Sequence, residues 1–217
     1  MQKNAGPLVW MDHHRWTILL GLLVVLVAIG GLEGHFNGLE RVSQIGMSFL
    51  FLGVVGAIER NTWLRAVMML PVAVWIALML ANNLWPGDGI DVLLTGVAAV
   101  LWAGSMLIGF RQLFVSAHSE YERLASGVFS YLLMAVIWGM IYWRIEAVAP
   151  GSFNLPDGVS GAQQGPFLYF SMITMTTVGY GEITPAAELP RMLTGLQAIV
   201  GTMFVAIFIG RSVGRLT

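Results

Sequence analysis

A short stretch near the C-terminus, T-T-V-G-Y-G, alternates glycines with larger residues. Glycine adopts positive φ values at little cost, so Gly179 and Gly181 allow successive backbone carbonyls to turn to one side, where a Cβ would clash. Val178 and Tyr180 can face the other way and pack the segment, and Thr177 adds a hydroxyl at one end of the row. A row of carbonyls can replace the water around a desolvated cation. The segment therefore predicts a cation site made of backbone oxygens.

The residues around this stretch place it between two apolar runs. Non-helical backbone at membrane depth is tolerated only where it is buried in protein or lines a water-filled path. The preceding segment, 166–176, is aromatic-rich and short enough for a half-helix. Pro166 suits the first helical turn, and the C-terminal end of the dipole would face a cation favourably. The alternative is a glycine-rich turn between two membrane spans, which this context makes the weaker explanation.

An apolar run, a half-helix, T-V-G-Y-G and a second apolar run together resemble the pore module of the tetrameric potassium-channel superfamily. The T-V-G-Y-G loop is the selectivity filter of that family, and the resemblance implies the same mechanism for this chain. The resemblance covers residues 125–217. It implies a filter of Thr176, Thr177, Val178, Gly179, Tyr180 and Gly181, with K+ bound at Thr177, Val178, Gly179 and Tyr180.

The assembly that the resemblance implies is a homotetramer. The chain holds a single T-V-G-Y-G and no internal repeat, so a closed ring of filter strands needs several copies. No cofactor is expected besides the permeant K+. The predicted activity is passive, potassium-selective conduction.

Composition independently predicts a membrane protein. Of 217 residues, 57% are apolar and 11% charged, and the mean hydropathy is +0.75, whereas about a quarter of a soluble protein is charged. Membrane lipids are therefore expected partners. A net charge of −1 argues against nucleic acid, and the absence of cysteine excludes disulfides and thiol chemistry.

Six apolar runs are near the length of about 20 residues that crosses a bilayer. They span residues 16–32, 42–58, 64–81, 92–110, 125–143 and 192–209. The first could be a signal peptide, but its A-I-G-G end is a poor cleavage site. We predict an all-α membrane protein of six transmembrane helices, with a re-entrant pore helix and filter loop between the fifth and sixth. Its parts are a four-helix domain at 1–116, a polar linker at 117–124 and a pore domain at 125–217.

Lysine and arginine are distributed unequally between the two predicted faces. A cytoplasmic N-terminus places eight of them inside and three outside, as the positive-inside rule expects. The inner set is Lys3, Arg15, Arg60, Arg65, Arg111, Arg123, Arg211 and Arg215, and the outer set is Arg41, Arg144 and Arg191. We expect a multi-pass protein of the plasma (inner) membrane with both termini cytoplasmic.

The segment behind the filter departs from the family. Tyr169 and Phe170 stand where many relatives have paired tryptophans, and their rings could still brace the filter. Phe170 has no donor for the hydroxyl of Tyr180, which leaves Thr174 as its expected partner.

A second departure concerns the acid that follows the filter. Ile173 stands where some bacterial relatives have a carboxylate paired with that acid, here Glu182. We hypothesise that Tyr169 donates a hydrogen bond to Glu182 instead.

The last apolar run contains the candidate gate. Gly201 lies 20 residues beyond Gly181, at the place of the family's hinge glycine, although packing through a small residue would explain it equally well. Thr202 and Val205 are candidates to line the cavity, and Gly210 would allow inner helices to approach closely. The alternative gate is an apolar constriction at Phe204, Phe208 or Ile209.

The first four helices do not resemble a voltage sensor. Each charge moved through the field contributes only about 2.3 kcal/mol per 100 mV, so several are required. The fourth run has none, and Arg111 stands alone at its end. Voltage gating by a row of arginines in the fourth helix is not expected. The residues of the first four helices indicate no other gating stimulus.

Other functional classes fit less well. Ser105 in the fourth run resembles the serine of rhomboid proteases, but the sixth run has no histidine to act as its base, so we do not expect an enzyme. The histidines are His13, His14, His35 and His118. A potassium transporter subunit or a non-conducting accessory subunit is the alternative, and the intact filter counts against both.

Overall fold

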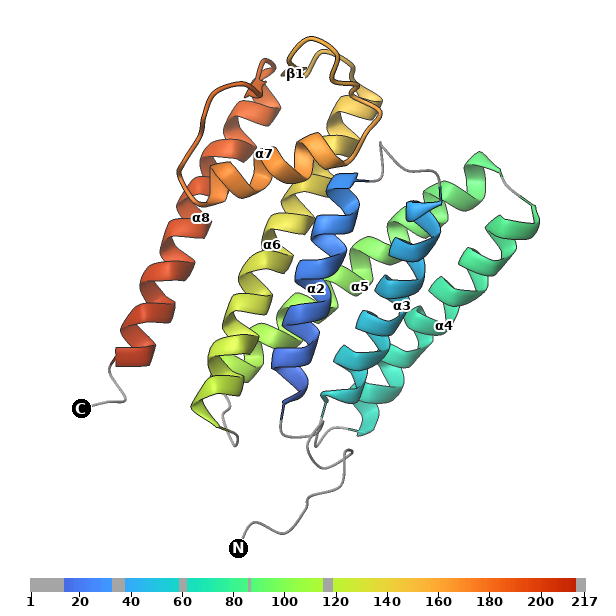
Figure 1. The fold of residues 1–217 in the computed structure, drawn as a ribbon, viewed down its shortest axis with the longest axis vertical. Helices are drawn as coiled ribbons and strands as arrows, with labels where there is room; N and C mark the ends of the chain where they lie inside the picture. Colours follow the sequence, from blue (N-terminus) through green and yellow to red (C-terminus); the bar gives the residue numbers. More distant parts are fainter. Residues whose placement is uncertain (1–13, 33–37, 59–61, 86, 115–118, 214–217) are drawn as a thin grey trace, which may run out of the picture. The chain divides into compact units, whose positions relative to one another are not determined.

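The computed structural model describes residues 14–32, 38–58, 62–85, 87–114 and 119–213, which are mostly helical (Figure 1). Its helices are α2 (Arg15–Leu32), α3 (Leu39–Gly56), α4 (Thr62–Leu84), α5 (Asp88–Phe114), α6 (Glu120–Val148), α7 (Gly165–Met175) and α8 (Glu188–Val213). Two short strands, β1 (Phe153–Asn154) and β2 (Thr184–Pro185), pair antiparallel, with Phe153 opposite Pro185. Each predicted apolar run lies on one of the long helices, and the predicted half-helix is α7.

The chain divides into two compact units. The N-terminal unit comprises residues 1–29 and 38–133, and the pore unit comprises 30–37 and 134–217, so helix α6 contributes to both. Some predictions concern residues outside the described ranges. These residues are His13, His35, His118, Lys3, Arg60 and Arg215.

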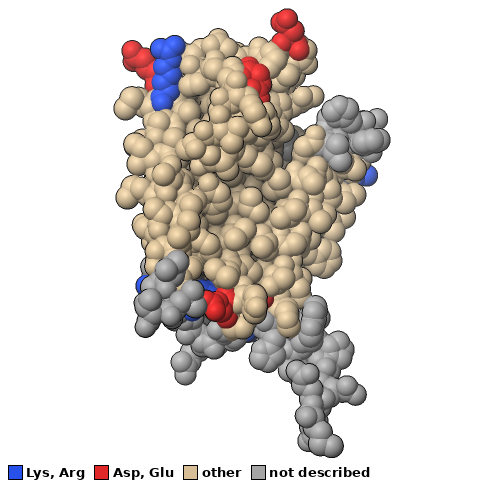
Figure 2. Space-filling model, turned by 60° about the vertical axis from the view of Figure 1, so that its left-hand side comes forward, with Lys and Arg blue, Asp and Glu red and all other residues tan. Residues whose placement is uncertain are grey.

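The helices confirm a multi-pass membrane fold. Among the described residues, four helical segments are long and apolar enough to span a bilayer: Trp63–Leu84, Val92–Gln112, Glu120–Val148 and Glu188–Ser212. Two shorter apolar segments are Arg15–Gly31 and Arg41–Gly56. Charged side chains gather at the ends of the face shown in Figure 2 and leave the band between them uncharged. Six crossings stay a prediction.

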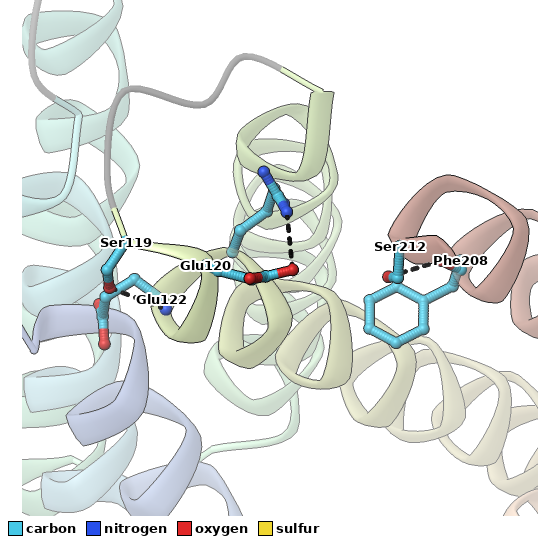
Figure 3. A network of polar contacts seen from close by, with 6 residues as sticks. Ser119, Glu120, Glu122, Phe208 and Ser212 are labelled. Atoms are coloured by element: carbon cyan, nitrogen blue, oxygen red, sulfur yellow. Dashed lines mark hydrogen bonds and ion pairs between the residues drawn. The ribbon is translucent and has the colours of Figure 1, made fainter. Parts of the chain in front are cut away.

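Helix α6 begins at Glu120, within the segment 117–124 that we predicted as a polar linker. Glu120 and Glu122 lie in the first turn of α6, where carboxylates interact favourably with the helix dipole. The amide of Glu122 donates to the hydroxyl of Ser119 over 3.4 Å, and Arg123 pairs with Glu120 at 3.6 Å (Figure 3). Acidic residues in the first turn are a helix-start signal.

The first turn of α6 also forms hydrogen bonds that stabilise the N-terminal unit. Glu122 is only 3% exposed and accepts hydrogen bonds from the amides of Trp16, at 2.7 Å, and Thr17, at 3.3 Å. A carboxylate of α6 thus caps the N-terminus of α2, which otherwise has unpaired amides.

Within α5 no charged residue lies between Asp91 and Arg111.

Candidate functional site

Helix α7 is an 11-residue helix with Pro166 in its first turn, as predicted. Its buried side chains Phe167 and Phe170 join a mostly aromatic cluster of the pore unit, whose other members are Tyr142, Phe153 and Ile183. Phe170 packs edge-to-face on Tyr142 at 5.4 Å and on Phe153 at 5.6 Å between ring centroids. Its contacts are with this aromatic core, so any support that Phe170 gives to the filter is indirect.

Two glycines let the backbone of α7 approach its neighbours closely. A Cβ on Gly139 of α6 would lie 2.8 Å from the Cα of Leu168, and one on Gly201 of α8 would lie 2.8 Å from the carbonyl oxygen of Met175. Real Cβ atoms do not approach backbone so closely. Small residues at helix contacts of this kind are typical of membrane proteins. The pore helix is therefore enclosed between two glycine contacts.

The second of these contacts bears on Gly201, for which the sequence allowed either a hinge or a packing role. Gly201 is buried, and helix α8 continues through it from Glu188 to Val213. Its contact with the end of α7 supports the packing role. Bending at Gly201 stays a prediction.

The filter backbone has an alternating conformation. The φ angle is positive at Thr177 (61°), Gly179 (50°) and Gly181 (92°), and it is not positive at Val178 or Tyr180. The positive values at the two glycines were expected. Among the described residues, Thr177 is the one non-glycine with positive φ, a conformation that is uncommon for a β-branched residue. Positive φ at every second residue is the pattern that the sequence predicts for a strand whose successive carbonyls turn towards one side.

The amides of this strand are paired with the last turn of the pore helix. Val178 and Gly179 both donate to the carbonyl oxygen of Ile173, at 2.9 and 3.1 Å, and Thr177 donates to Thr174 at 3.0 Å. Thr176 caps α7, and its hydroxyl donates to the carbonyl of Met172 at 2.8 Å. These bonds are intramolecular, so the amides of residues 176–179 need no water.

The carbonyl oxygens of the same strand differ from its amides in their hydrogen bonding. Among the described residues, no hydrogen bond reaches a carbonyl oxygen of residues 177–181. A backbone acceptor left unpaired in this way is costly unless water or a cation satisfies it. The strand can therefore offer a row of oxygens to a ligand.

The predicted contact between Tyr169 and Glu182 is confirmed. The Tyr169 hydroxyl donates a hydrogen bond to the Glu182 carboxylate, which joins the pore helix to the residue after the filter. This bond, together with partial burial and the negative charge of Glu182, raises the pKa of Tyr169 to about 12. The hydroxyl therefore stays protonated at neutral pH, and the contact persists.

The predicted bond between Tyr180 and Thr174 is wrong for the single chain. No hydrogen bond joins these two described residues, and the Tyr180 side chain is 74% exposed. Val178 is also 51% exposed. Both side chains are therefore exposed in the single chain.

The remaining gate and cavity candidates also lie on α8. Thr202, Val205 and Gly210 are exposed, and the Thr202 hydroxyl donates to Ala198 of its own helix at 2.8 Å. Phe204 and Phe208 stack with centroids 6.2 Å apart.

Three polar residues of the pore unit were missed by the sequence analysis. Tyr142 of α6, Ser171 of α7 and Gln197 of α8 are fully buried and joined by hydrogen bonds. The available signal was the lone glutamine within the apolar run 192–209, because a polar side chain at membrane depth usually has a polar partner on another helix.

The packing role of Gly201 predicts the effect of enlarging it. Gly201→Ala should lower the free energy of unfolding of the purified protein by about 1–3 kcal/mol, because the pore helix must shift to make room for the methyl group. Gly195→Ala is the matched control on α8, since nothing lies within 4 Å of its Cβ. Unchanged stability combined with altered channel opening would support the hinge role instead.

The contact at Tyr169 predicts a pH-dependent filter. Tyr169→Phe removes the donor and should make potassium current decay faster during sustained opening, as recorded from purified protein in bilayers. A raised pKa means that the bond contributes fully below pH 10 and is lost as the pH approaches about 12, so wild-type current should become similarly unstable there. Tyr121→Phe, at an 82% exposed residue, is the control. Identical decay in wild type and Tyr169→Phe would contradict this role.

Comparison with known proteins identifies the region that contains the site. Residues 126–217 match a family described as ion channels. The chain is 29% identical over 100 residues to the two-pore potassium channel 4 of Arabidopsis thaliana, covering 45% of this chain and 34% of that protein. It is 26% identical over 104 residues to the two pore potassium channel a of Oryza sativa subsp. japonica, covering 46% of this chain and 26% of that protein.

The matched region therefore spans about a third or less of these curated relatives. A family of ion channels is not a family of enzymes, which confirms that the chain is not an enzyme. Residues 126–217 are therefore similar to a family of ion channels, and the two relatives with which this chain shares 29% and 26% identity are named as potassium channels.

Proposed function

We propose that this protein is a potassium-selective channel subunit that conducts K+ passively through carbonyls of residues 176–181. The observation that carries the proposal is the alternating φ pattern of T-V-G-Y-G, in which the amides of residues 177–179 donate hydrogen bonds to carbonyls of the pore helix. Both relatives are named as potassium channels, which supports K+ as the permeant ion.

The selectivity mechanism follows from the placement of the polar groups. Rows of carbonyl oxygens from the family's four filter loops replace the hydration shell of K+. The bonds to Ile173 and Thr174 fix one side of each strand, which leaves its oxygens for the ion. No cofactor besides the permeant ion is needed.

The assembly that we propose is a homotetramer, because each chain supplies one filter strand. Exposed apolar side chains support it: Val178 and Tyr180 in the filter and Leu196, Ile199 and Met203 on α8 are at least half exposed in the single chain. Neighbouring copies or lipid would cover these surfaces. Closed rotational symmetry is the usual outcome when one chain repeats such an interface.

The membrane arrangement that we propose has six crossings, with both termini cytoplasmic in the plasma membrane. The excess of Lys and Arg on one predicted face supports this orientation. Because α5 carries no charge between Asp91 and Arg111, opening does not depend on a conventional voltage sensor. The gate lies towards the end of α8, where Gly210 or the Phe204–Phe208 stack narrows the path.

Ion flux from liposomes tests this function. Purified protein should pass K+ and Rb+ far better than Na+, and external Ba2+ should block the flux. Gly179→Ala should abolish selective flux, because the positive φ of residue 179 places a Cβ in a strained position.

The control for this experiment is Ser105→Ala, which alters a buried residue of α5 outside the pore unit. Its K+ flux should equal that of the wild type. Equal permeation of Na+ and K+ by the wild-type protein would refute the proposed function.

A further inference from the structure

Gln197 is a buried amide at the centre of a hydrogen-bond network between three helices. Its Nε2 group donates to both the carbonyl oxygen of Ser171, at 3.0 Å, and the hydroxyl of Ser171, at 2.7 Å. Its Oε1 atom accepts from the hydroxyl of Tyr142 at 2.7 Å, and the Ser171 hydroxyl donates to the carbonyl of Ala135 at 2.7 Å. The amide thereby joins α8 to the pore helix and to α6.

The network is closed to solvent and fully paired. Tyr142, Ser171 and Gln197 are each 0% exposed. Both amide hydrogens of Gln197 and its oxygen have partners, so no polar group of that side chain is buried unpaired. Polar networks that are fully satisfied fix one arrangement of the groups they join, because any displacement leaves a buried group without its partner.

The position of the network connects it to the filter. Ser171 precedes Ile173 by two residues in α7, and the carbonyl of Ile173 accepts the amides of Val178 and Gly179. Gln197 precedes Gly201 by one helical turn, so both face the pore helix from the same side of α8. Gln197 therefore fixes the position and rotation of the last turn of α7, to which the amides of the filter strand are hydrogen-bonded.

We infer that Gln197 is a positioning residue for ion selectivity, acting through Ser171 on the filter carbonyls. This inference rests on the proposed channel function. Groups that orient the ligands of an ion site matter about 10–100-fold in affinity or activity when they are removed. A polar contact that only held helices together would instead affect how much protein folds.

Gln197→Met tests the inference, because methionine has a similar length but cannot donate to Ser171 or accept from Tyr142. We expect the ratio of K+ to Na+ flux to fall by at least about ten-fold. Ser171→Ala removes the hydroxyl partner and should lower the same ratio. The double variant should be no less selective than the worse single variant, since both act through one contact.

The readout is the flux ratio of the protein that folds and assembles, measured in liposomes. Ser212→Ala is the control on the same helix, because its hydroxyl donates to Phe208 within α8 (Figure 3) and it should retain the wild-type ratio. If Gln197→Met does not fold, the smaller change Ser171→Ala decides the question.

The outcomes separate this inference from the proposed function. A selective wild type with equally selective Gln197→Met and Ser171→Ala variants would overturn the role of Gln197 and leave the channel function intact. A wild type that does not distinguish K+ from Na+ would overturn the channel function itself.

Discussion

The hydrogen bonds from the amides of Val178 and Gly179 to the carbonyl of Ile173 are the interaction on which the site depends. A strand outside regular secondary structure is expensive at membrane depth, because its amides and carbonyls have no water to bond. These bonds satisfy amides from within the chain. They leave the carbonyls of the strand available, which is the arrangement that a desolvated cation requires.

The remainder of the pore unit fixes the helix that supplies Ile173. Close backbone contacts at Gly139 and Gly201 limit its translation, and the aromatic cluster around Phe167 fills the space beside it. Glu146 orders the segment that leads to it by accepting the amides of Gly151 at 2.8 Å and Phe153 at 3.0 Å. The pore helix is therefore positioned by contacts of several kinds, from residues far apart in the sequence.

The sequence was most informative where a local residue type decides the outcome. Apolar runs predicted the long helices, Pro166 the start of the pore helix, and Gly179 and Gly181 the positive φ angles. Thr177 adopts the same conformation without a residue-type signal.

Contacts between distant residues were harder to predict. Gln197 meets a partner 26 residues away and another 55 residues away, and nothing local in the sequence specifies either. The expected bond from Tyr180 to Thr174 is absent in the single chain, where the Tyr180 side chain is 74% exposed. A crystal structure of the assembled protein in Rb+, with anomalous scattering used to find the ion, tests the central claim most directly. We predict Rb+ peaks on the symmetry axis between carbonyl rings of residues 177–180, and an axis without ions, or carbonyls turned away from it, would contradict the account.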